Sequence, residues 1–390
     1  MFRVIDGAPG NRGIPVRSWA EDLDDETLGQ LRRIARAPYV RHFVCAMADA
    51  HLSEHVAVGS VFAAERTVVP SALGGDLGCG MLAVPLVDDT GAALDTGGLG
   101  PAERRRLLER WLASIPVGKA LRRGAPLPFA SALGPDLFQA QLSTRSLEKT
   151  REALVVKHIG TLGGGNHFVE LGCDAERRAW LLVHSGSRGL GAAIADHHRG
   201  AERQPLAGLS TTHGSGEAYL GDLGWALDFA RANRMHIACV ATRALEELLG
   251  QPVAHGPPVD VHHNFVAEET WFGERLLVHR KGAIAAPAGA LALVPGSMGT
   301  ASYLVAGRGC EAAFGSCSHG AGRVLRRSEA RRKIRPDALR RALGDVVIPD
   351  GDAMVEEAPA AYRDIRKVLE AQEDLVERRL RLEPLVVLKG

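Results

Sequence analysis

Apolar residues recur at three- and four-residue steps along several segments, which is the spacing of one buried face of an α-helix. This pattern predicts helices at 21–37, 217–249 and about 362–380. In the first of these, acidic residues stand early and arginines late, as the helix dipole favours. The segment 101–123 predicts one helix or a helical pair, interrupted at Pro116.

Shorter apolar runs, several of which end directly in glycine, serine or histidine, predict β-strands. These runs are 56–63, 80–87, 179–184, 274–279 and 290–295. Because the two kinds of element are interleaved, the chain is expected to form a mixed α/β or α+β fold with a large central sheet. No linker rich in proline, glycine or serine divides the chain, so we expect one compact catalytic unit.

Composition excludes some classes of protein. Of the 390 residues, 46% are hydrophobic and 24% are charged, which excludes disorder as the main state. The 47 basic and 46 acidic residues leave a net charge of +1, which argues against coating nucleic acid through bulk basicity. There is no apolar run of about 18 residues and no signal-peptide-like start, so no membrane span or export is expected. Six cysteines without paired spacing favour a reduced, cytoplasmic protein.

Polar groups that suit a metal site stand repeatedly in glycine-flanked segments. One carboxylate, one thiolate and several imidazoles suit zinc, manganese or iron in an open catalytic site, and a thiolate can bridge two ions. Any one of these histidines could instead satisfy a turn, but the whole set favours a site. The segments are GGDLGCGM (74–81), GTLGGGNHFVE (160–170), LVHSGSRGLG (182–191), DVHHNF (260–265) and FGSCSHGAGR (314–323).

Three glycine-rich turns also combine small residues with hydroxyl or guanidinium donors, as phosphate binding requires. They are HSGSRG, PGSMGTAS (295–302) and SHGAGR, and none is a Walker loop. A phosphate-bearing substrate and a set of tight turns therefore both remain possible interpretations. His319 has two interpretations as well, a further metal ligand or a nucleophile. The room beside its ring and the nearby Arg323 favour the nucleophile.

The ordered motifs resemble the RtcB family of RNA-splicing ligases. They are GGDLGCG, GTLGGGNHFVE, HSGSRGLG, DVHHN, VHRKGA (278–283), PGSMGTASY (295–303), HGAGR (319–323) and the terminal LKG, and MADAHLSEHVAVGSVFA (47–63) extends the match toward the N-terminus. The resemblance implies an α+β fold, a single catalytic domain over 1–390 with central mixed or antiparallel sheets flanked by helices. Residues 1–45 would be a divergent N-terminal segment, and 321–380 a basic and helical C-terminal part.

By the same resemblance, the chain would be a ligase that joins an RNA 3′-phosphate or 2′,3′-cyclic phosphate to a 5′-hydroxyl end, with GTP and Mn²⁺. His319 would carry GMP as a phosphoramidate before GMP moves to the 3′-phosphate. Arg188 and Arg323 would contact phosphate or the RNA end. The implied metal ligands, with Cys79 bridging two ions, are Asp76, Cys79, His167, His184 and His263. The implied nucleotide contacts are Asn166, Glu170, Ser297, Ser302, Tyr362 and Lys389.

Some residues depart from the family pattern, namely Gly75, Met81 and the stretch GTLGGGNHF. They suit a divergent bacterial paralogue, with a possible translation-repair partner. Two alternatives stay open: GTP-dependent capping of DNA or RNA 3′-phosphate ends, and an end-binding repair protein with weak catalysis.

Other residues have more ordinary interpretations. His51 is a candidate for supporting the site, and His262 competes with His263 as a ligand. His197 and His198 are expected at the surface. The run 321–335 holds seven basic residues and one acid, and could provide a small positive surface that seats a phosphorylated end.

Overall fold

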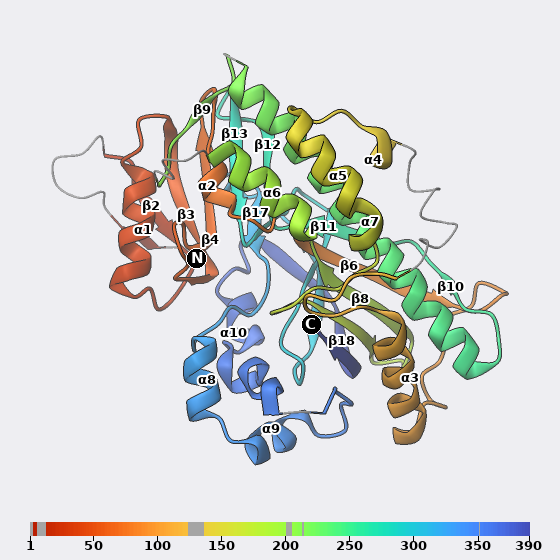
Figure 1. Ribbon diagram of the computed structural model, residues 1–390. Helices are drawn as coiled ribbons and strands as arrows, with labels where there is room; N and C mark the ends of the chain where they lie inside the picture. The colour runs from red at the N-terminus through yellow and green to blue at the C-terminus, as the bar shows by residue number, and fades with distance from the viewer. Residues whose placement is uncertain (1–2, 6–12, 124–135, 200–204, 213, 351) are drawn as a thin grey trace.

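The computed structural model describes residues 3–5, 13–123, 136–199, 205–212, 214–350 and 352–390. Among them, the first four strands of the chain and two later strands form a mixed six-stranded sheet (Figure 1). Its strands in spatial order are β1 (Arg3–Ile5), β2 (Val16–Ser18), β3 (Val40–His51), β4 (Val58–Ala64), β13 (Glu274–Lys281) and β12 (Asn264–Trp271). The β2–β3 pair is parallel and the other neighbours are antiparallel.

A second sheet of eight strands is antiparallel throughout. Its strands in order are β10 (Ala254–His255), β6 (Gly80–Val87), β8 (Ala179–Ser185), β7 (Phe168–Cys173), β18 (Val376–Lys389), β16 (Ser302–Gly307) and β15 (Leu291–Val294), and β11 (Val259–His262) also pairs with β6. Two short strand pairs complete the described sheets: β14 (Ala283–Ala285) with β17 (Ser316–Ser318), and β5 (Thr67–Val68) with β9 (Leu209–Ser210).

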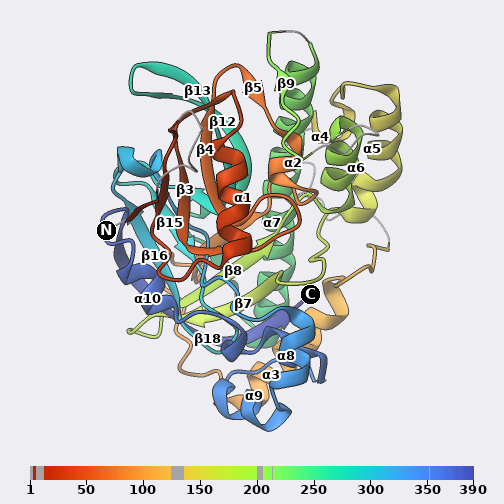
Figure 2. The same ribbon diagram turned by 90° about the vertical axis from the view of Figure 1, so that its left-hand side faces the viewer.

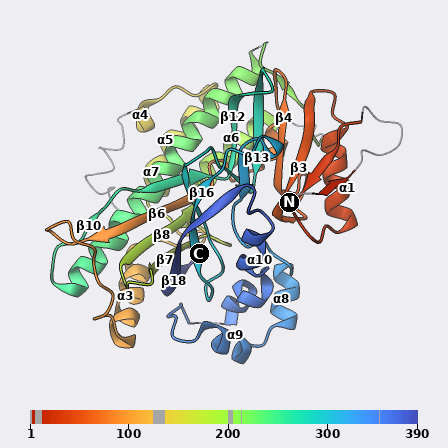
Figure 3. The ribbon, with the colours of Figure 1, turned by 180° about the vertical axis from the view of Figure 1, so that it is seen from behind.

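Helices flank both sheets. They are α1 (Asp25–Ala35), α2 (Pro70–Leu73), α3 (Pro101–Ser114), α4 (Asp136–Gln139), α5 (Arg145–His158), α6 (Arg188–Arg199), α7 (Ser215–Leu249), α8 (Arg327–Lys333), α9 (Pro336–Leu343) and α10 (Ile365–Glu370). The long helix α7 packs against β8 and β6, with α3 beside it and α6 on its outer side (Figures 1 and 2). Helices α8 to α10 lie together near the C-terminal strand β18 (Figure 3).

Alternate residues of the second sheet face opposite layers, as the two-residue period of a strand requires. Leu181 and Val183 of β8 pack in the cluster that contains residues of α3 and α7. Leu182 packs instead with Leu339 of α9. Since His184 shares the parity of Leu182, its side chain lies on the α9 side of the sheet, and this face carries the candidate site.

Most of the predicted elements are confirmed. The segment 217–249 lies in α7, the run 80–87 is β6, and α3 ends at Ser114, just before Pro116. Helix α1 begins later than predicted, at Asp25, because the side chain of Asp24 caps it by accepting a hydrogen bond from Thr27 N at 2.6 Å. The α+β fold with mixed and antiparallel sheets flanked by helices is therefore confirmed.

Two predictions are wrong. The helix predicted at 362–380 is only the short α10, and β18 begins at Val376, because the end of this segment pairs with β16. The side chain of His198 is only 7% exposed instead of lying at the surface, and its Nε2 lies 2.6 Å from Asp222 Oδ2, although His197 is exposed as expected. Over the described ranges, no helix is long and apolar enough to cross a membrane.

Candidate active site

Five potential metal ligands meet at one end of the second sheet. They are Asp76 and Cys79, which precede β6; His167, which precedes β7; His184, near the end of β8; and His263, between β11 and β12. Strand pairing brings them together, because Phe168 lies opposite His184 and Gly80 lies opposite both Ser185 and His262. The backbone N–H of His263 also donates a hydrogen bond to Cys79 O at 2.8 Å.

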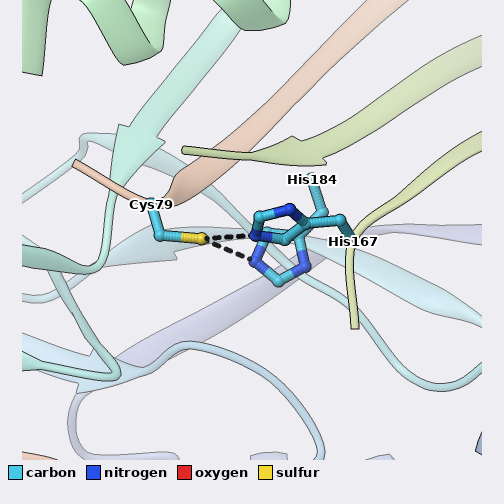
Figure 4. A group of neighbouring side chains, drawn as sticks. All are labelled: Cys79, His167 and His184. Carbon is cyan, nitrogen blue, oxygen red and sulfur yellow. Dashed lines mark hydrogen bonds between the residues drawn. The ribbon is translucent and has the colours of Figure 1, made fainter. Parts of the chain in front are cut away.

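The ligand atoms converge on the thiol of Cys79. Its Sγ lies 3.3 Å from Nε2 of His167 and 3.3 Å from Nε2 of His184, and Figure 4 shows both rings directed at the sulfur. His167 Nε2 also lies 3.2 Å from Asp76 Oδ2, and His184 Nε2 lies 3.0 Å from His263 Nε2. One Cys and two His atoms within 4.8 Å of one another form a group that can hold a metal ion.

The backbone directs the imidazoles toward this point. Nδ1 of His167 lies 2.9 Å from Leu162 O, and Nδ1 of His184 lies 3.1 Å from Asn166 O. These carbonyls accept the Nδ1 protons, so each ring presents the lone pair of Nε2 to the cluster. Burial, followed by the neighbouring histidines, lowers the pKa of His184 well below its ordinary value. The ring is therefore neutral near pH 7, as a metal ligand must be.

The charges in the cluster also fit a cation. Burial alone would raise the pKa of Asp76, but the adjacent His167 holds it below its ordinary value. Burial and the Asp76 carboxylate raise the pKa of the Cys79 thiol. A bound cation would reverse this effect, since metal coordination deprotonates a thiol. The carboxylate, thiol and imidazoles thus fit a borderline divalent ion.

His319 lies beside this cluster, just after β17. Its ring centroid is 4.7 Å from that of His263, and its Nδ1 lies 2.6 Å from Oδ2 of Asp49 on β3. Asp49 is fully buried, and its Oδ2 also accepts a hydrogen bond from the backbone N–H of His319 at 3.2 Å. Burial would raise the pKa of Asp49, but His319 lowers it below its ordinary value. Asp49 lies in the matched segment 47–63, but the sequence indicated no role for it.

The two competing histidines of the DVHHNF segment have different surroundings. His263 contacts His184 and His319, whereas Nδ1 of His262 lies 2.9 Å from Gly78 O, beneath the loop that carries Cys79. His51 lines the same cavity as His319, with its Nδ1 2.8 Å from Asp49 O. The geometry therefore favours His263 over His262 as the ligand.

A second group of polar residues lines the same cavity. Glu170 is buried, and within the described part of the chain its Oε1 has no hydrogen-bond partner. Burial raises the pKa of this carboxyl group to about 8, although Lys389 opposes the effect. Nζ of Lys389 donates to Asn166 O at 3.0 Å and lies 3.3 Å from Oε2 of Glu357. Glu357, which also accepts a short hydrogen bond from Tyr362, was not identified from the sequence.

The arginines expected to contact phosphate or the RNA end, and the serines expected to contact the nucleotide, differ in position. Arg323 lines the cavity, stacks over the ring of Tyr362 at 4.9 Å and lies 3.0 Å from Glu357 Oε1. Ser297 and Ser302 also line the cavity. Arg188 is not among the lining residues: its guanidinium donates to Thr161 Oγ1 and Gly118 O, each at 3.3 Å.

One cavity of about 820 Å³ joins these groups. It is lined by Asp76, Cys79, Asn166, Glu170, His184, His263, Ser297, Ser302, His319, Arg323, Tyr362 and Lys389. The volume is that of a pocket for a small molecule or cofactor. Asp24, Asp25 and Glu26 also line the cavity, at the N-terminal end of α1, and Glu26 pairs with Arg326 at 3.3 Å.

Comparison with known proteins assigns the chain to a family. The family model described as tRNA-splicing ligase RtcB matches residues 30–390. The chain belongs to the RtcB family. It is 33% identical to the RNA-splicing ligase RtcB of Escherichia coli K12, over 96% of this chain and 97% of that protein. It is also 29% identical to the tRNA-splicing ligase RtcB of Pyrobaculum aerophilum, over 100% and 98% of the two chains.

The family resemblance derived from the motifs is therefore confirmed. Among the residues that line the cavity, only Asp24, Asp25 and Glu26 lie before the segment that the RtcB family model matches. The clustered side chains thus lie within the segment that the family model matches, whereas these three acidic residues, which also line the cavity, precede that segment.

Proposed function

We propose that this chain is an RNA ligase that joins a 3′-phosphate or 2′,3′-cyclic phosphate end to a 5′-hydroxyl end, using GTP and Mn²⁺. The observation that carries the proposal is the position of His319, which contacts both the buried carboxylate of Asp49 and the ring of His263. A nucleophilic imidazole beside a cation site suits nucleotidyl transfer. The names of the relatives, RNA-splicing and tRNA-splicing ligases, support RNA as the substrate.

The proposed manganese ligands are those of the cluster, with the Cys79 thiolate able to bridge two ions. They are Asp76, Cys79, His167, His184 and His263. When bound, Mn²⁺ would offset negative charge on the transferring phosphoryl group and on the leaving pyrophosphate. The contribution of the chain is to keep the imidazoles neutral and directed at the metal through the carbonyls of Leu162 and Asn166.

In the proposed first step, Nε2 of His319 attacks the α-phosphorus of GTP. A nitrogen–phosphorus bond forms and the bond from phosphorus to the pyrophosphate oxygen breaks. Because Oδ2 of Asp49 lies 2.6 Å from Nδ1, it holds a proton there and leaves the lone pair on Nε2. The same carboxylate stabilises the positive charge that develops on the ring. Water would first open a cyclic phosphate to the 3′-phosphate. An oxygen of that phosphate would then take GMP from His319, as the nitrogen–phosphorus bond breaks. The 5′-hydroxyl would finally attack the phosphorus of the 3′-phosphate, forming the new phosphodiester and releasing GMP.

The group formed by Glu170, Tyr362 and Lys389 in the cavity suits a guanine base. The unpartnered Oε1 of Glu170 can accept from the N–H groups of guanine, and the ammonium of Lys389 can donate to its oxygen. The ring of Tyr362 can stack on the base. We assign the nucleotide's remaining polar contacts to Asn166, Ser297 and Ser302, and contact with phosphate or the RNA end to Arg188 and Arg323.

The same proposal extends to the domain organisation, the cellular location and the partners of the protein. We propose that residues 1–390 act as one catalytic unit, since the cavity is lined by residues from Asp24 to Lys389. All six cysteines are free thiols, which supports a cytoplasmic location. A DNA end and a translation-repair partner are alternatives that defined substrates can test.

The first test is the covalent adduct. The protein is incubated with Mn²⁺ and α-labelled GTP, and the acid-labile label that stays on the protein is measured. The His319→Ala variant should lose the adduct, whereas the matched variant His55→Ala, a histidine outside the cavity lining, should keep it. Label that persists in His319→Ala would refute the proposed nucleophile.

The second test separates joining from its alternatives. RNA and DNA strands with a 3′-phosphate are offered with and without a partner that carries a 5′-hydroxyl. We expect a sealed RNA product only when the partner is present. A guanylylated strand that is never sealed would establish a capping enzyme instead, and strand binding without either product would establish an end-binding protein.

A further inference from the structure

Two polar residues lie side by side in the middle of α7, far along the chain from the proposed ligands. Asn233 and Arg234 are both completely buried. A helix interior offers a polar side chain no backbone partner of its own, and a buried guanidinium is costly unless it is paired and hydrogen-bonded. These two side chains meet that requirement by bonding to the segments that carry the metal ligands.

Arg234 connects three of these segments. Its Nη1 donates to Gly78 O and Ser185 O, each at 3.0 Å. Its Nε and Nη2 donate to the two carboxylate oxygens of Asp260 at 3.0 and 2.5 Å. Gly78 precedes Cys79, Ser185 follows His184, and Asp260 lies in the strand that leads to His263. One planar guanidinium thus holds the chain next to three of the five proposed ligands.

Asn233 connects the remaining histidine segment to the same place. Its Oδ1 accepts from Gly160 N at 2.7 Å, and its Nδ2 donates to Thr161 O, Ser185 Oγ and Gly186 O at 3.1 to 3.2 Å. The hydroxyl of Ser185 in turn donates to Leu162 O at 2.9 Å. Leu162 O is the carbonyl that directs the ring of His167, so Asn233 reaches that ligand through Ser185.

We propose that Asn233 and Arg234 are positioning residues that hold the ligand-bearing segments in the geometry of the metal site before any metal binds. The inference rests on the proposed metal site. It follows because the segments that carry Cys79 and His167 are glycine-rich loops, so their own backbone does little to restrict them. The arginine fork is rigid and has several donors, which allows one side chain to fix several carbonyls. Metal affinity depends on such supporting groups as well as on the ligands.

Arg234 and the loops that carry the proposed ligands pack so closely that two neighbouring glycines have no room for a side chain. A Cβ atom added to Gly80 would lie 3.0 Å from Nη1 of Arg234 and 2.2 Å from Val261 O. A Cβ atom added to Gly186 would lie 2.3 Å from Oδ1 of Asp76. Glycine at these positions therefore lets the guanidinium and the metal-site loops approach one another.

The test compares Arg234→Lys and Asn233→Ala with a matched control. Lysine keeps the positive charge beside Asp260 but cannot bond Gly78, Ser185 and Asp260 at once. The control is Arg280→Lys, because Arg280 is equally buried and its guanidinium also bonds a carboxylate, that of Glu269, and a carbonyl, that of Phe314. None of these partners adjoins a proposed ligand. Each metal-free protein is titrated with Co²⁺, and its thiolate-to-cobalt absorption band and its unfolding temperature are recorded.

We expect Arg234→Lys and Asn233→Ala to raise the Co²⁺ dissociation constant by about 10- to 100-fold and to alter the cobalt spectrum. Arg280→Lys should lower the unfolding temperature to a similar extent but leave the titration and the spectrum unchanged. If folded Arg234→Lys binds Co²⁺ with unchanged affinity and spectrum, the positioning role is refuted. If it does not fold, Asn233→Ala decides by the same criterion, since it leaves Arg234 and Asp260 paired.

Failure of the metal site itself has a different signature. If the unsubstituted protein shows no thiolate band with Co²⁺, or if Cys79→Ala retains that band, the proposed ligand set is wrong and the positioning role falls with it. A normal band in the unsubstituted protein with unchanged Arg234→Lys and Asn233→Ala variants refutes only the positioning role.

Discussion

Replacing Glu170 by glutamine should make the nucleotide-free protein more stable while impairing its use of GTP. Glu170 is 2% exposed, and within the described part of the chain its Oε1 has no hydrogen-bond partner. Burial raises the pKa of its carboxyl group to about 8 from an ordinary value of 4.5. Glutamine has nearly the same shape but never ionises, so it removes the cost of a buried charge.

The sign of the pH dependence follows from proton binding. Below about pH 4.5 the carboxyl group is protonated in both the folded and the unfolded chain, so it contributes no difference. As the pH rises from about 4.5 to about 8, the unfolded chain loses the proton and the folded chain keeps it, so folding becomes less favourable. Above about pH 8 both states are ionised and the loss is complete.

The size of this loss can be estimated from the same two pKa values. A tenfold change in proton affinity corresponds to about 1.4 kcal/mol, so the difference between 4.5 and about 8 corresponds to about 5 kcal/mol at high pH and about 3 kcal/mol at pH 7. The glutamine variant lacks this decline. It should therefore gain stability relative to the unsubstituted protein as the pH rises.

The assay is urea unfolding of both proteins at pH 5 and pH 9 without nucleotide. The free-energy difference between variant and unsubstituted protein should grow by several kcal/mol between these pH values. Glu109→Gln, at an exposed position on α3, is the control and should show no such growth. A Glu170→Gln difference that is equal at the two pH values would show that the carboxyl group does not titrate as argued. GTP-dependent adduct formation by this variant should also require more GTP.

Four further substitutions test the rest of the site. Asp49→Asn should slow formation of the protein–GMP adduct by about 100- to 10,000-fold, because an amide can donate to Nδ1 of His319 and place the proton on the wrong nitrogen; an unchanged rate of labelling would exclude that role. Cys79→Ala should lose metal and adduct together, and two tightly bound ions in this variant, counted by elemental analysis, would contradict a bridging thiolate. Lys389→Ala should raise the GTP concentration needed for half-maximal labelling while metal content stays the same; an unchanged GTP dependence would remove Lys389 from base recognition. Glu26→Gln should change the free energy of unfolding by less than about 1 kcal/mol, because the pair with Arg326 is exposed on both sides, and urea unfolding can check this.

The sequence predicted elements well where one segment could determine its own structure. The apolar period of 217–249 is long enough to identify α7, and the run 80–87 is apolar enough to identify β6. The segment 362–380 was misjudged because its apolar spacing fits a helix over a short window. Its last residues pair with β16, which lies about 70 residues earlier in the chain, and no local pattern reveals that pairing.

The site was predictable to the extent that its residues stand in unusual local settings. Cys79, His167 and His184 lie among glycines, which marks close backbone approach and irregular loops. Asp49 lies instead inside an apolar strand, and Arg234 inside a long helix, where a polar residue has no distinctive neighbours. Their importance follows from bonds to residues that are distant in the chain, namely His319 for Asp49 and Gly78 for Arg234.

The basic run 321–335 shows how the fold changes the meaning of a charge pattern. Carboxylates contributed by other segments engage many of its cations: Glu26 pairs with Arg326, Glu356 with Arg331, and Glu357 with Arg323 and Arg327. The run is therefore less positive in the folded protein than its seven basic residues suggest. These pairs are not equivalent, however. Arg326 and Glu26 are each about 70% exposed, whereas Glu357 is almost completely buried against Arg323.

That difference in burial decides which cations an RNA phosphate can recruit. An exposed ion pair contributes less than about 1 kcal/mol, so a phosphate can replace Glu26 beside Arg326 at little cost. Separating Arg323 from Glu357 would leave a buried carboxylate without that partner, which costs several kcal/mol. Under the proposed function, Arg323 would therefore act on a bound nucleotide or RNA end from its fixed place beside Tyr362 and Glu357. Arg326, at the N-terminal cap of α8, has an exposed partner and is the cation that could exchange its carboxylate for the backbone of an arriving strand at least cost.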